Sequence, residues 1–98
     1  MKYRCYYKVV KTLKDKCHFK YPVNIRRTKM SDFGECVFDE DKKEFKIYIN
    51  SESPEEVAID TIMHEAAHIL SWQHRLHHGK GWGIAYSKIY RIYEKEFL

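Results

Sequence analysis

Hydrophobic residues recur every three or four positions in the first segment of the chain, with lysines between them. This spacing predicts an amphipathic helix over residues 3–19, because positions three and four apart share one face of a helix. The apolar positions of that face are Tyr6, Val9, Val10, Leu13 and Cys17. Pro22 is expected to end the helix, since proline cannot continue it.

Hydrophobic and polar residues then alternate, which is typical of strands with one buried face. Residues 23–28 (VNIRRT) predict a short first strand. Residues 34–50 predict a hairpin that turns at the charged residues 39–43. We expect the three strands to be antiparallel. The last of them, residues 45–50, is expected at the exposed edge of the sheet, where it would bind an extended substrate.

A second helix is expected after the hairpin. Ser53 is a candidate N-cap, Pro54 suits the first helical position, and Glu56 has capping-box spacing from Ser53. The apolar pattern predicts that this helix ends near Gln73 or Leu76.

Gly79, Gly81 and Gly83 are expected to break the chain before a last helix at residues 83–96. The predicted order is an N-terminal helix, three strands, a second helix and a C-terminal helix. This order indicates an α+β fold, with the helices on one face of a small three-stranded antiparallel sheet.

The composition narrows the class of protein. The chain has 98 residues, 44% hydrophobic and 33% charged, which fits a single globular domain over residues 1–98 and excludes a disordered chain. Three cysteines form no CxxC pair, which predicts reduced thiols. No apolar run is long enough to span a membrane, and the first residues lack a secretory signal. We therefore expect a cytoplasmic monomer. The net charge of +4 leaves nucleic-acid contact open.

Five of the six histidines lie between residues 61 and 82, and two of them form the sequence HEAAH. His64 and His68 are expected on one helix face, with Cβ atoms roughly 5–6 Å apart, so both can bind one zinc ion. Glu65 points roughly 100° around the helix from His64. It is expected as an exposed cleft residue beside a zinc-bound water, where a general base is needed. The alternative is that these histidines are incidental surface or core residues.

Zinc chemistry requires more than two ligands. The ion lowers the pKa of a bound water from about 15.7 to about 7, and a catalytic site combines three protein ligands with one open position. One zinc per chain is therefore expected. The candidates for the third ligand are His74, His77 and His78.

HEAAH followed by HHGKGW resembles the SprT-like zinc metallopeptidases, in which HExxH precedes a histidine in an H-G-x-x-aromatic pattern. The resemblance implies that His64, His68 and His78 bind zinc, that Glu65 is the catalytic base, and that the fold is zincin-like. Its motifs cover residues 59–82. The chain departs from larger members of the family because it has no cysteine-rich zinc ribbon.

The expected function is therefore that of a zinc metalloendopeptidase. One alternative is a non-catalytic zinc-containing binding protein for a host protein or nucleic acid, and another is a zinc hydrolase acting on a non-peptide bond. Asp60 is a candidate to orient His64, although an exposed helix carboxylate is the simpler interpretation. Tyr86 and Tyr90 are expected in the core, with contact to a reacting oxyanion as the alternative.

Overall fold

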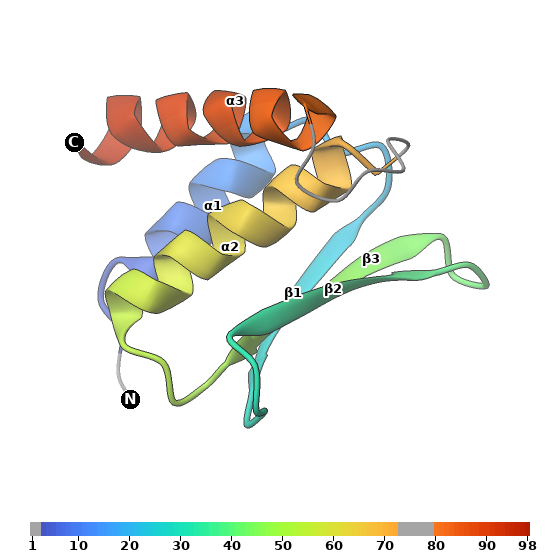
Figure 1. The fold of residues 1–98 in the computed structure, drawn as a ribbon, viewed down its shortest axis with the longest axis horizontal. Coiled ribbons are helices and arrows are strands. Elements are labelled where there is room, and N and C mark those ends of the chain that lie inside the picture. The colour runs from blue at the N-terminus through green and yellow to red at the C-terminus, as the bar shows by residue number, and fades with distance from the viewer. Residues whose placement is uncertain (1–2, 73–79) are drawn as a thin grey trace.

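The computed structural model describes residues 3–72 and 80–98, which form an α+β fold with all three helices on one side of a three-stranded sheet (Figure 1). The elements are α1 (Tyr6–Lys16), β1 (Val23–Thr28), β2 (Gly34–Asp39), β3 (Glu44–Asn50), α2 (Glu55–Leu70) and α3 (Lys80–Phe97). The predicted order of helices and strands is confirmed. Within these residues, no helix is both long and apolar enough to cross a membrane.

The sheet is mixed, so the prediction of an antiparallel sheet is wrong. β2 and β3 form the predicted antiparallel hairpin, but β1 pairs with β3 in parallel, and the strand order is β1-β3-β2. Because β1 and β2 run in opposite directions, residues 29–33 need only cross the end of β3, roughly 10 Å for two strand spacings. The Asn50 side chain holds this crossing in place by donating hydrogen bonds to the carbonyl oxygens of Met30 and Asp32, at 2.9 and 3.0 Å.

This order places β3 in the centre of the sheet. The prediction that residues 45–50 form an exposed edge is therefore wrong, and β1 and β2 are the edges among the described strands. The alternation along β3 has a different consequence: Phe45, Ile47 and Ile49 point to the helices and are buried. Strand alternation identifies which residues face the core, but it contains no information on which strand is central.

α2 is the helix that packs directly on the sheet, and α1 and α3 pack against α2 (Figure 1). It is therefore enclosed on several sides, and eight of its residues are buried. Ala58, Ile62 and Ala67 have no exposed surface. Two of the predicted zinc ligands, His64 and His68, thus belong to the most enclosed of the described helices.

The helix starts differ from the prediction. α1 begins at Tyr6 because the backbone N–H groups of Cys5 and Tyr6 donate hydrogen bonds to Glu55 Oε2, at 2.7 and 3.0 Å. These backbone hydrogen bonds, that of Tyr6 foremost, lower the pKa of Glu55. Ser53 is not the N-cap of α2: Pro54 occupies that position, and no side chain caps the helix. Glu55 therefore links the starts of two helices that are far apart in sequence.

The helix ends also differ. α1 ends at Lys16, well before Pro22, and α2 ends at Leu70 instead of near Gln73 or Leu76. α3 begins at Lys80, so Gly81 and Gly83 are helical, and the prediction that they break the chain is wrong for both. Gly79 lies outside the described residues. A helical glycine costs about 1 kcal/mol relative to alanine, which tertiary packing can offset.

Gly34 allows β2 to approach α2 closely. A methyl group on Gly34 would lie 2.7 Å from Thr61 Cγ2 and 2.8 Å from the Tyr48 carbonyl oxygen. We expect Gly34→Ala to lower the free energy of unfolding by about 1–3 kcal/mol, because the strand must shift away from the helix. Urea unfolding measures the change.

Gly83→Ala is the matched control for this substitution. Apart from its chain neighbours and the nearby backbone of its own helix α3, no atom of the described residues lies within 4 Å of the position that its methyl group would take. We expect the control to stabilise the protein by up to about 1 kcal/mol, through helix propensity alone. Equal unfolding free energies for the two variants would contradict the close packing of β2 on α2.

Candidate metal centre

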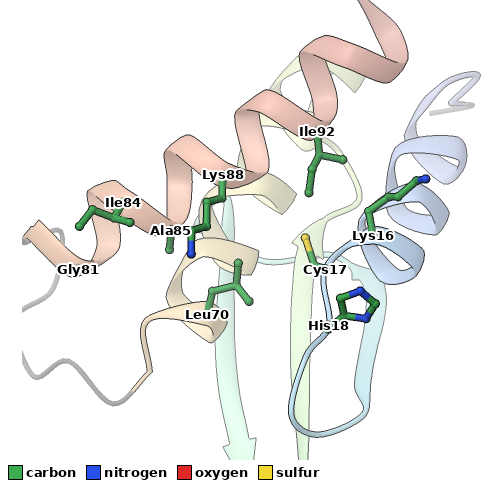
Figure 2. A pocket seen from close by; sticks show the side chains of 9 residues that line it. All are labelled: Lys16, Cys17, His18, Leu70, Gly81, Ile84, Ala85, Lys88 and Ile92. Atoms are coloured by element: carbon green, nitrogen blue, oxygen red, sulfur yellow. The ribbon is translucent and has the colours of Figure 1, made fainter.

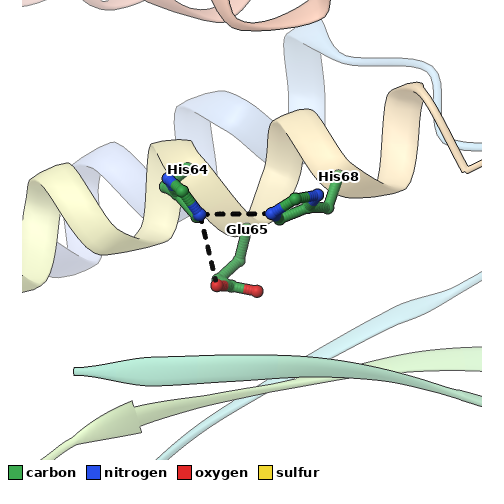
Figure 3. A group of neighbouring side chains, drawn as sticks. All are labelled: His64, Glu65 and His68. Carbon is green, nitrogen blue, oxygen red and sulfur yellow. Dashed lines mark hydrogen bonds and ion pairs between the residues drawn. The ribbon is translucent and has the colours of Figure 1, made fainter. Parts of the chain in front are cut away.

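The middle of α2 brings two imidazoles together. His64 and His68 lie one turn apart on the same helix face, and their Nε2 atoms are 3.1 Å apart (Figure 3). Their ring centroids are 4.8 Å apart. Both side chains are partly exposed, so ligand atoms and solvent can reach the same point between them.

This pair fits a zinc ion. Two nitrogen ligands at about 2.0–2.1 Å on a tetrahedral ion are about 3.3–3.4 Å apart, and the observed separation of 3.1 Å differs from this by only a few tenths of an ångström. Without a metal, the same separation suits a hydrogen bond from one neutral imidazole to the other. The two rings therefore need little movement to bind one ion.

Glu65 completes the cluster from the side that faces the sheet (Figure 3). Its Oε1 atom is 4.0 Å from His64 Nε2, and ligand atoms of His64, Glu65 and His68 all lie within 4.8 Å of one another. Glu65 is only 7% exposed, so the expectation of an exposed cleft glutamate is wrong. Because β2 and β3 pack against α2, a residue pointing from α2 to the sheet is covered.

The environment of Glu65 disfavours its negative charge. Burial, and then the negative charge of Glu35 on β2, raise the pKa of Glu65 to about 7. On the same strand, burial, and then the charge of Glu65, raise the pKa of Cys36 to about 12. β2 thus forms a wall facing Glu65 of α2. A nearby positive charge would stabilise the charged form of a carboxylate buried here.

Trp82, in the first turn of α3, covers the two imidazoles. Its ring centroid lies 5.1 Å from that of His64 and 5.9 Å from that of His68, and its indole N–H donates a hydrogen bond to the His64 carbonyl oxygen at 3.4 Å. In the sequence, Trp82 is notable only as the aromatic residue of the H-G-x-x-W pattern, which assigns it no role. The H-G-x-x-W pattern is the sequence feature from which this contact could have been predicted.

A second aromatic residue extends this wall along α3. Tyr86 stacks on Trp82, with centroids 5.1 Å apart, and its hydroxyl donates a hydrogen bond to Asp60 Oδ1 at 3.1 Å. Burial, and then the charge of Asp60, raise the pKa of Tyr86 to about 12. Asp60 therefore binds Tyr86 instead of orienting His64. Tyr90 is 39% exposed, so the core position expected for it is wrong.

The described residues contain two of the three predicted histidine ligands. His64 and His68 lie together with Glu65, as their spacing implied. His74, His77 and His78 lie outside the described residues, so the choice of His78 as third ligand stays a prediction.

Comparisons with protein-family models, with curated proteins and with solved structures gave no match. The SprT-like resemblance therefore depends on the sequence motifs alone. The distances within the cluster are compatible with a metal ion whether or not the family resemblance holds.

Proposed function

We propose that this protein is a zinc-dependent metalloendopeptidase of the SprT-like type, with a zincin-like fold. The observation that supports this most strongly is the cluster of His64, His68 and Glu65, whose ligand atoms converge within 4.8 Å on one enclosed helix. A purely structural site has no use for a general base, whereas a carboxylate buried beside two histidines, at a cost in free energy, can serve as one.

Each residue has a distinct role in this proposal. His64, His68 and His78 hold one zinc ion through neutral imidazole nitrogens. When bound, zinc supplies a Lewis acid for a carbonyl oxygen and for water. Glu65 takes a proton from the attacking water and then gives it to the leaving amine. The wall formed by β2 limits solvent access on the Glu65 side, which strengthens its interaction with charge that develops nearby.

We place the substrate along β2 instead of along residues 45–50. β2 is an edge strand among those described, and it packs against α2 beside Glu65. An extended peptide can add to such an edge through main-chain hydrogen bonds. Gly34 supports this placement because its lack of a side chain lets β2 lie close to Thr61 of α2.

The test is a comparison of peptide-library cleavage by zinc-loaded wild-type protein and by Glu65→Gln, with zinc content measured in both. Cleavage by wild type alone, with zinc in both, supports the peptidase. A substrate panel of esters and non-peptide amides run in parallel separates a peptidase from a zinc hydrolase of another specificity.

A non-catalytic zinc-containing binding protein is the alternative, and the distribution of charge favours nucleic acid as its partner. Residues 2–29 include ten Lys or Arg and one acidic residue, Asp15. Lys8, Lys11 and Lys14 are exposed on α1. Such a surface can neutralise backbone phosphates.

If that surface binds DNA, affinity should fall steeply as salt rises, because bound counterions are released. Fluorescence polarisation with labelled single- and double-stranded DNA between about 50 and 200 mM salt measures the slope. A Lys8→Glu, Lys11→Glu double variant should bind more weakly, with a smaller slope. If no binding is found at about 50 mM salt, where such contacts are strongest, nucleic acid is not a partner.

A further inference from the structure

A cavity of about 430 Å³ lies apart from the histidine cluster, where the end of α1, the end of α2 and residues 81–92 of α3 meet (Figure 2). Its apolar walls are Leu70 of α2 and Ile84, Ala85 and Ile92 of α3. Its described lining does not include His64, Glu65 or His68. Cavities of roughly 300–1,000 Å³ with mostly apolar walls are typical of small-molecule sites.

Basic side chains border this apolar interior. Lys88 extends from α3 toward Leu70, and His18 lies on the other side of the hollow (Figure 2). Lys16 is 4.0 Å from Glu96, so part of its charge is already balanced. Lys88 forms no ion pair with any residue that the structure describes. It is therefore the best-placed cation for an anionic group at the mouth of the cavity.

The surface next to this cavity also carries basic side chains. His18 also borders two adjoining hollows, whose described walls include Lys14 and Lys20. Among the described residues that line these three hollows, there is no aspartate or glutamate. By contrast, residues 30–65, which include His64 and Glu65 of the metal cluster, contain eleven acidic and three basic residues. The basic walls therefore attract an anion to the cavity.

We propose that this cavity binds a free fatty carboxylate, with its carboxylate group at Lys88 and its aliphatic tail against Leu70, Ile84 and Ile92. The residues that line the cavity suggest both the tail and the charged group of this ligand. An apolar interior favours a hydrocarbon chain, and a lysine without a carboxylate partner at the mouth favours a single negative charge. The site is separate from the proposed peptidase site, because its described lining and the metal cluster share no residue.

Isothermal titration calorimetry of the whole chain with octanoate, below its micelle concentration, tests the proposal. We expect one site per chain. Octan-1-ol, which has the same tail without the charge, should bind at least tenfold more weakly. Decanoate should bind about tenfold more tightly than octanoate, because two more methylene groups leave water. No octanoate binding, or equal binding of octan-1-ol, would overturn the proposal.

Lys88→Glu identifies the charged group, and Lys95→Glu is its matched control on α3. Both lysines are exposed, and Lys95 does not line the cavity. We expect Lys88→Glu to weaken octanoate binding at least tenfold and Lys95→Glu to leave it unchanged. An equal loss in both variants would show attraction by overall charge and would overturn the assigned site.

Ile84→Ser tests the contribution of the apolar wall to ligand binding. Ile84 is exposed at the surface of α3, so Ile84→Ser should fold normally, as circular dichroism can verify. It should weaken decanoate binding several-fold, and unchanged affinity would contradict the proposed position of the tail.

A further titration uses phosphatidylglycerol vesicles without free fatty acid. Vesicle binding that depends on Lys88, without octanoate binding in solution, would show that this surface binds membranes. It would overturn the proposal of a free fatty carboxylate.

Discussion

Glu65→Gln is expected to lower peptide hydrolysis by the zinc-loaded protein by about 10²–10⁴-fold, the usual contribution of a general base. Glutamine has nearly the same size and shape as glutamate, but its amide cannot take a proton from water. Since Glu65 is buried between α2 and the sheet, a smaller residue would leave a gap, and glutamine avoids this. The change therefore isolates the proton transfer from the packing.

The fold of this variant should be as stable as wild type or slightly more so. Burial raises the pKa of Glu65, which means that the native structure disfavours its charged form when no cation is bound. Removal of that charge should not lower the free energy of unfolding of the zinc-free protein. Urea unfolding of the two zinc-free proteins measures the difference, and a large destabilisation would contradict the geometry described for Glu65.

Glu56→Gln is the matched control, because Glu56 lies on the same helix but is exposed. It should keep both zinc and activity. A broad peptide library with mass-spectrometric detection suits a protein whose substrate is unknown. Equal cleavage by wild type and Glu65→Gln would mean that Glu65 is not the base or that a contaminant cleaves the library. Loss of zinc from Glu65→Gln would identify Glu65 as a ligand.

A third outcome separates the proposed functions. If the wild-type protein binds zinc but cleaves nothing in the library, the binding-protein alternative is favoured. Failure of the peptidase proposal would leave the fatty-carboxylate site untouched, because octanoate binding is measured without any hydrolysis.

Local features of this fold could be predicted from the sequence because they depend on residues close together in the chain. His64 and His68 share a face because one helical turn separates them. The β2–β3 hairpin follows from alternation around a charged turn. The faces of these elements were therefore predicted correctly even where their ends were not.

The errors concern contacts between distant segments. The parallel pairing of β1 with β3 depends on how residues 29–33 cross the end of the sheet, and Asn50 holds that crossing from the far end of the hairpin. The burial of Glu65 depends on the packing of the sheet against α2. The partner of Asp60, Tyr86, lies on a different helix, α3. No periodicity within one element contains this information.

Substitution of either cluster histidine should remove zinc almost completely. His64→Ala and His68→Ala each delete one of two imidazole nitrogens that lie 3.1 Å apart, so the remaining nitrogen has lost its partner on the helix. Loss of groups that merely support a ligand costs about 10–100-fold in metal affinity, and loss of a ligand itself should cost more. Zinc measured by mass spectrometry after dialysis should fall from about one per chain to near zero.

His18→Ala is the control for these variants, because His18 is exposed and does not belong to the cluster. It should keep its zinc. The same measurement on His74→Ala, His77→Ala and His78→Ala identifies the third ligand. Full zinc in His78→Ala, with loss in either of the others, would show that the ligand assignment implied by the SprT-like resemblance is wrong.

Thermal unfolding provides a second measurement of the same site. A ligand at 100 times its dissociation constant stabilises the native state by about 2.7 kcal/mol. For a domain of this size, that corresponds to a rise in the unfolding temperature of roughly 10–20 °C. Zinc should produce this rise in wild type and in His18→Ala, but not in His64→Ala or His68→Ala. An equal rise in all four proteins would place the zinc elsewhere and would contradict a metal centre on α2.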